Sequence, residues 1–75
     1  MQIWLIERDE DIGYDEWDAK VVVAETEQAA RELAALDTAD EGKTVWFDQS
    51  RCVATVIGTA DDPSPRVILG SLNAG

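Results

Sequence analysis

The chain contains no histidine and a single cysteine, Cys52. A lone cysteine cannot form an internal disulfide, and without histidine or further cysteines the usual ligands of a zinc site are missing. A serine or cysteine nucleophile would also lack the imidazole base that normally activates it. We therefore expect a reduced, cytoplasmic protein without enzymatic activity and without a cofactor.

Basic residues are scarce as well: the chain has six lysines and arginines but sixteen aspartates and glutamates, which gives a net charge of −10. Nucleic acids and anionic lipids attract proteins largely through lysine and arginine, so neither is expected as a direct ligand. No apolar run approaches the roughly 20 residues that span a membrane, and the N-terminus lacks a secretion-signal pattern. The hydrophobic fraction of 45% is nevertheless that of a folded chain. We expect one small domain, 1–75.

Apolar, β-branched runs predict strands over 2–8 and 18–25, and again over 43–48, 52–58 and 66–70. Between the second and third of these runs, apolar residues recur at helical spacing, which predicts an amphipathic helix over 27–37 with Thr26 as its N-cap. The order β-β-α-β-β-β predicts an α+β fold of two layers, with one helix packed on an antiparallel or mixed sheet of about five strands.

One short helix can cover only one face of this sheet, although strand alternation places apolar side chains on both faces. The set assigned to the helix side is Ile3, Leu5, Val21, Val23, Val45 and Phe47. The outer face then carries Trp4, Ile6, Val22 and Trp46. Exposed apolar patches of this kind mark association surfaces, so we predict a homodimer through these four residues. Alternatively, the acidic loop or the C-terminal segment folds under the sheet and buries them.

The loop 9–17 combines carboxylates with large rings. Its carboxylates suggest a cation site, but counted from Asp9 the sixth position of a calcium loop falls on Tyr14 instead of glycine. We predict no metal site, with an irregular calcium site as the alternative. Aromatic anchors and steering carboxylates favour contact with a basic protein. The predicted partner-binding residues are Asp11, Tyr14, Asp15, Glu16 and Trp17. The alternative is that the two rings fold onto the sheet and the acids form a solvated rim.

Three parts of the chain carry a wider resemblance. They are Ile3-Trp4-Leu5-Ile6 with Gly13-Tyr14-Asp15-Glu16, then Ala30-Arg31-Glu32-Leu33-Ala34, and Val67-Ile68-Leu69-Gly70. In these parts the chain resembles small uncharacterised acidic proteins encoded by actinobacterial phages. The resemblance implies an accessory protein in the cytoplasm of an infected bacterium that acts by binding a host protein. It assigns no functional residues.

Two hypotheses of function follow. In the first, the chain is an acidic protein-binding module for a basic host or phage protein, including the case of a nucleic-acid mimic. In the second, it is a structural or assembly protein that self-associates through the apolar outer face of its sheet. Binding through charge weakens in salt, whereas association through apolar burial survives it.

Overall fold

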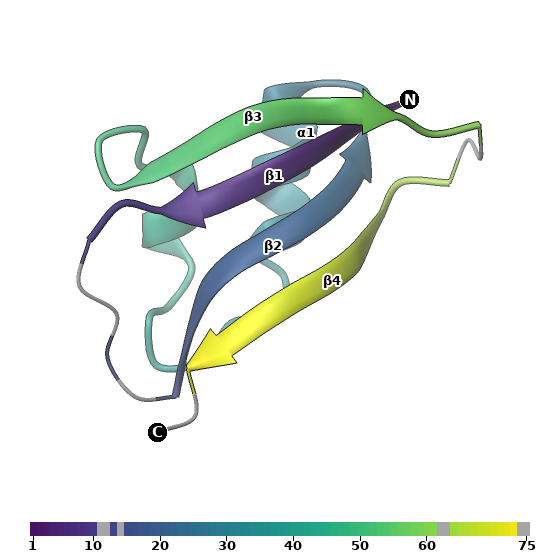
Figure 1. Cartoon of the computed structure of the whole chain (residues 1–75). Helices are drawn as coiled ribbons and strands as arrows, with labels where there is room; N and C mark the ends of the chain where they lie inside the picture. Colours follow the sequence, from purple (N-terminus) through teal and green to yellow (C-terminus); the bar gives the residue numbers. More distant parts are fainter. Residues whose placement is uncertain (11–12, 14, 62–63, 74–75) are drawn as a thin grey trace.

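The computed structural model describes residues 1–10, 13, 15–61 and 64–73. These residues form a four-stranded sheet, one α-helix and one 3₁₀ turn (Figure 1). In chain order the elements are β1 (Gln2–Arg8), β2 (Glu16–Ala24), α1 (Glu27–Ala34), the 3₁₀ turn η1 (Thr44–Phe47), β3 (Cys52–Thr59) and β4 (Arg66–Asn73). The predicted α+β class is confirmed.

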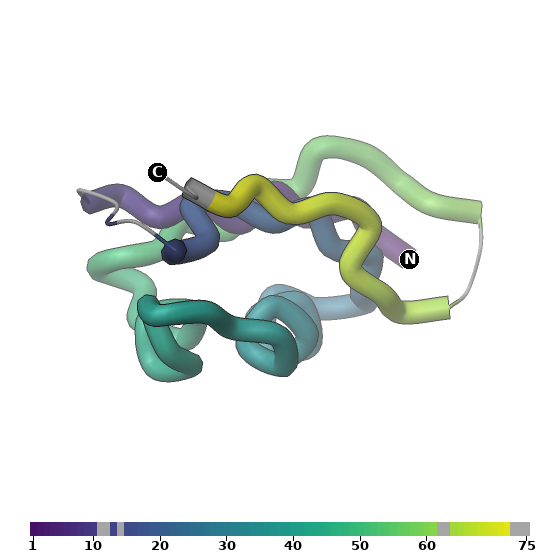
Figure 2. The backbone as a smooth tube through the Cα atoms, turned by 90° about the horizontal axis from the view of Figure 1, so that it is seen from below, coloured from purple at the N-terminus to yellow at the C-terminus, as the bar shows by residue number. Residues whose placement is uncertain are grey.

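The sheet is antiparallel, in the strand order β3-β1-β2-β4. The strands β1 and β2 are central, while β3 and β4 are its two edges. Helix α1, the loop that follows it and η1 all lie on one side of the sheet, so the molecule has two layers (Figure 2). The helix begins as predicted, because the Thr26 hydroxyl accepts a hydrogen bond of 3.1 Å from the Ala29 amide.

The predicted strand over 43–48 is wrong, and the described residues contain four strands instead of about five. Val45 and Trp46 in this segment are both fully buried. Consecutive residues of a strand point to opposite faces, so a strand beside the sheet would bury one of these side chains and expose the other. The 3₁₀ turn η1 directs both side chains into the core.

The predicted assignment of the two sheet faces is also wrong. Trp4, Ile6, Val22 and Trp46 lie in the core between sheet and helix, with exposed fractions of 9% for Trp4 and 0% for the other three. On the helix side this core contains Leu33 and three small alanines, Ala29, Ala30 and Ala34, which leave room for the indole rings. Because the fold already encloses these four side chains, they cannot form the dimer interface predicted for them. The opposite face of the sheet is the one left without cover.

Candidate functional site

Three of the six basic side chains lie inside the fold. The side chain of Arg8 is 3% exposed, and Lys20 and Arg31 are 2% and 3% exposed. A fourth, Arg51, pairs at the surface with Glu10 at 3.0 Å. Because three basic side chains are buried and a fourth is ion-paired, carboxylates dominate the surface that faces solvent.

Lys20 holds the end of the helix from the neighbouring strand. Its ammonium donates to the Ala34 carbonyl at 2.7 Å and to the Asp37 carbonyl. It also lies 5.0 Å and 4.9 Å from the ring centroids of Trp17 and Trp46. Burial lowers the pKa of Lys20, against the opposing charges of nearby carboxylates. The cation thus satisfies the Ala34 carbonyl, which the helix leaves unpaired at its C-terminus, and holds the loop that follows through Asp37.

Arg31 connects the helix to η1 and to the start of β3. Its guanidinium donates to the carbonyl oxygens of Trp46 and Cys52, each at 3.0 Å, and pairs with Glu27 at 2.9 Å. These bonds fix η1 and the start of β3 against α1. The Cys52 side chain beside them is buried, and this burial raises the pKa of its thiol. A thiol that stays protonated is a poor nucleophile, so Cys52 acts as a core residue.

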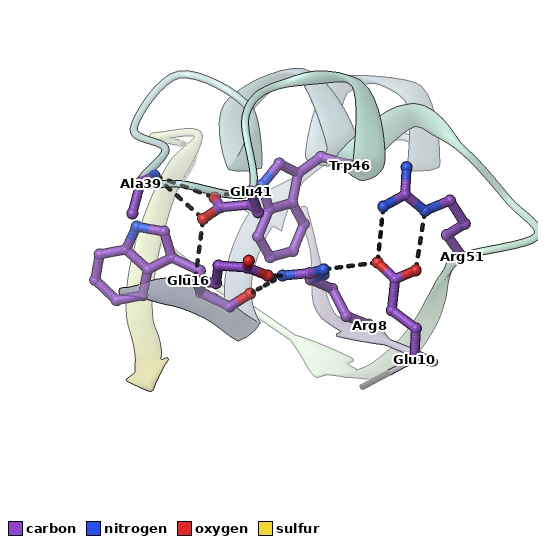
Figure 3. A network of polar contacts seen from close by, with 8 residues as sticks. Arg8, Glu10, Glu16, Ala39, Glu41, Trp46 and Arg51 are labelled. Atoms are coloured by element: carbon purple, nitrogen blue, oxygen red, sulfur yellow. Dashed lines mark hydrogen bonds and ion pairs between the residues drawn. The ribbon is translucent and has the colours of Figure 1, made fainter. Parts of the chain in front are cut away.

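Arg8 fixes both ends of the loop between β1 and β2 (Figure 3). Its guanidinium donates to Glu10 at 2.6 Å and to Glu16 at 2.7 Å, and it also bonds the Trp17 carbonyl. Glu10 accepts two further bonds from Arg51, each of 3.0 Å. The Arg51 bonds, followed by the Arg8 bond, lower the pKa of Glu10 to about 2. The negative charges of Glu10 and Glu16 are therefore both paired with arginines of the same chain.

Glu41 attaches the loop after the helix to the start of β2 (Figure 3). Its carboxylate accepts hydrogen bonds from the Trp17 amide at 3.1 Å, the Ala39 amide at 3.2 Å and the Trp46 indole at 3.1 Å. Burial opposes the ionisation of Glu41, but these bonds outweigh it and lower the pKa. The Asp40 amide also donates to the Asp15 carbonyl at 2.9 Å. The loop after the helix is thus held beside Asp15 and the start of β2.

These contacts decide what becomes of the predicted partner-binding residues. Asp11 and Tyr14 lie outside the described residues. Glu16 is half-buried in its ion pair with Arg8, and Trp17 is half-buried against the core, so the ring folds onto the sheet. Asp15 is exposed, with a backbone φ of 58°. Of the described members of the set, Asp15 alone presents its side chain fully to solvent.

The structure adds two carboxylates that were missing from the predicted site. Asp37 and Asp40 are exposed on the loop after α1, and the bonds to Lys20 and Asp15 hold this loop beside the start of β2. We call Asp15, Asp37 and Asp40 the acidic end. The acidic run after the predicted helix was visible in the sequence, but its position next to Asp15 depends on the tertiary contacts of Lys20 and Glu41.

The described residues show no arrangement for metal binding, since they contain no group of three or more cysteine, aspartate or glutamate side chains placed to hold an ion. Within the same residues, no helix has the length and apolar character needed to cross a bilayer. Comparison with protein-family models, curated proteins and solved structures found no match to this chain.

Proposed function

We propose that the protein is a non-enzymatic acidic module that binds a protein with a basic surface through its acidic end. The burial of Arg8, Lys20 and Arg31 is the observation that carries the proposal, because it removes half of the positive charge from the surface of a chain with net charge −10. Such a surface steers a basic partner toward it and speeds encounter.

The acidic end is held in a defined position. The backbone bond between Asp40 and Asp15, together with the Glu41 bonds to Trp17 and Ala39, fixes Asp15 and Asp40 beside each other. A positioned set of carboxylates loses less conformational entropy on binding than a mobile acidic tail does. We place the module, in keeping with the phage resemblance, in the cytoplasm of a bacterial host. Its partner is a host or phage protein. A basic surface on that partner, of the kind that ordinarily binds nucleic acid, would complement the negative charge of the acidic end.

The test compares two variants that remove equal charge. One variant replaces the acidic end, as Asp15→Asn, Asp37→Asn and Asp40→Asn. The control replaces three exposed acids elsewhere, as Glu25→Gln, Glu32→Gln and Asp61→Asn. Each protein is used to capture partners from actinobacterial lysate at low and high salt, and the affinity of the captured partner is then measured after purification.

We expect the wild-type chain to retain a basic protein at low salt and to release it at high salt. The acidic-end variant should bind that protein about tenfold more weakly, since each exposed charge contributes a few tenths to one kcal/mol. The control variant should bind nearly as tightly as wild type. Equal losses in both variants, or capture that salt does not weaken, would show that the acidic end is not the binding site.

A further inference from the structure

The outer face of the sheet is apolar and no described element covers it. Cross-strand pairs share a face, and the central row of this face is formed by Thr55 opposite Leu5, Leu5 opposite Val21, and Val21 opposite Leu69. In the next row, Ile3 stands opposite Val23, whose side chain is already fully buried within the single chain. Figure 2 shows that α1, η1 and the intervening loop all lie on the other side of the sheet.

The central row of this face carries no charged side chain. At the paired positions described, charged side chains stand only toward the two ends, with Glu7 opposite Ala19 and Arg66 opposite Val23. Two chains of net charge −10 repel each other over most of their surfaces. Here two copies can meet without placing carboxylates against one another, whereas a basic partner finds no carboxylate to pair with in these rows.

The face has both a recess and a projecting side chain. A shallow hollow of about 140 Å³ lies beside Leu5 and Val21, where the small paired residues Ala19 and Ser71 leave space. Leu69 stands at the rim of this hollow and is 64% exposed. An interface around a two-fold axis requires that one patch carry both partners of every contact. This patch carries a projecting side chain and a recess next to it.

The size of the face suits a small dimer. Four strands about 4.8 Å apart and about seven residues long at about 3.3 Å each project roughly 440 Å² per copy. Two flat faces give about 900 Å², and the uneven surface of the side chains raises the buried area toward the roughly 1,000 Å² that is the lower bound for a biological interface.

We propose that the outer sheet face binds a second copy of this chain. The two sheets pack face to face around a two-fold axis, and Leu69 of each copy fills the hollow beside Leu5 and Val21 of the other. This interface is separate from the acidic end, so either surface can bind without the other. The two are distinguished by salt: screening weakens binding of a basic protein but strengthens the association of two acidic copies.

The first experiment measures molar mass by light scattering behind a sizing column. We expect wild-type chain at micromolar concentration to run at twice the 8.2 kDa of one chain, at low and at high salt. Leu69→Glu should weaken the dimer about hundredfold, because it buries a carboxylate in each copy. The matched control is Leu36→Glu, which alters a side chain that is 72% exposed and lies outside this face. Circular dichroism verifies that both variants fold.

A second experiment needs no substitution. In a mixture of isotope-labelled and unlabelled wild-type chain, a filtered NOE spectrum should show contacts between copies from the methyl groups of Leu5, Val21 and Leu69. Contacts from Ile68 or Val56 alone would indicate pairing through the sheet edges and would overturn the proposal. A wild-type mass of 8.2 kDa at millimolar concentration, or equal dissociation by Leu36→Glu, would overturn it as well.

Discussion

At the scale of single residues, Glu10 shows how the chain uses its few cations. Two arginines from different segments donate to one carboxylate, Arg8 from β1 and Arg51 from the turn before β3. The three bonds join the start of the long loop to the turn that enters β3, where Arg8 pairs with Cys52. Because Glu10 lies at the surface, the effect of these bonds can be measured as a shift of its pKa.

We predict that Glu10 titrates at about 2 in the folded chain, below its ordinary 4.5. Arg51→Gln should move this pKa back toward the ordinary value, and the control Arg66→Gln should leave it unchanged. Both are measured by NMR of the Glu10 side chain across an acid titration. A wild-type midpoint near 4.5 would contradict the contact with the two arginines.

The same pKa shift fixes a pH dependence of stability. A carboxyl whose pKa is lower in the folded chain stabilises the fold above its unfolded pKa, and this contribution disappears as pH falls through the folded pKa. The stabilisation by Glu10 is therefore complete above 4.5 and is lost between 4.5 and about 2. The variant Glu10→Gln should show a flatter profile of unfolding free energy over that interval.

At the scale of elements, Gly70 decides how closely β4 approaches the ring of Trp17. A Cβ atom at position 70 would lie 2.7 Å from Trp17 Cζ3, closer than such atoms normally come. Gly58 on the opposite edge strand is a matched case, since a Cβ there would lie an ordinary 3.5 Å from Ile3 Cδ1. The glycine on β4 thus makes room for the indole packed against the core.

We predict that Gly70→Ala destabilises the fold by about 1–3 kcal/mol, the usual cost of forcing extra volume into a packed site. Gly58→Ala should change the free energy of unfolding by less than about 0.5 kcal/mol. Urea unfolding followed by tryptophan fluorescence measures both. Equal effects of the two substitutions would mean that strand geometry, and not the ring of Trp17, sets the cost.

Local sequence signals predicted the start of α1 but not its end. The Thr26 cap is a property of neighbouring residues, whereas the helix ends where Lys20, remote in sequence, bonds the carbonyl oxygens of Ala34 and Asp37. The misread segment 43–48 has the same explanation, because both Val45 and Trp46 are directed inward by contacts with α1. Contacts distant in the sequence decide these features.

At the scale of the whole molecule, alternation predicted that one face of the sheet would lack cover but could not tell which. Both faces of β1 are apolar, and the choice depends on the fit of Trp4 and Trp46 beneath the alanines of α1. The candidate site was predictable only in part for a similar reason. Asp15 belonged to the acidic loop in the sequence, while Asp37 and Asp40 join it only through the folding of another loop.

The net charge should make the stability of the fold sensitive to salt. The Debye length falls from about 30 Å at 0.01 M to about 3 Å at 1 M salt. The radius of gyration is 11.5 Å, so at the lower salt most carboxylates lie within one Debye length of one another and repel. We predict that sodium chloride raises the urea midpoint of the dilute chain, because screening relieves this repulsion.

The control for this prediction is the variant with Glu25→Gln, Glu32→Gln and Asp61→Asn. Removing three negative charges changes the net charge from −10 to −7, so the midpoint should rise less with salt than in the wild-type chain. A midpoint that falls as salt is added would show the reverse balance, in which loss of ion pairs such as Arg8–Glu16 outweighs the relief of repulsion.

Two of the three buried cations cross between the layers in opposite directions, Lys20 from β2 to the end of α1 and Arg31 from α1 to the backbone around η1 and β3. If the helix slid along or lifted off the sheet, four carbonyl oxygens and two buried charges would lose their hydrogen-bond partners at the same time. An isolated eight-residue helix is unstable in water, yet here it cannot unfold while the strands stay paired. The hydrogen-bonded amide protons of its last turn should consequently exchange with solvent only in the rare openings in which the sheet also unfolds.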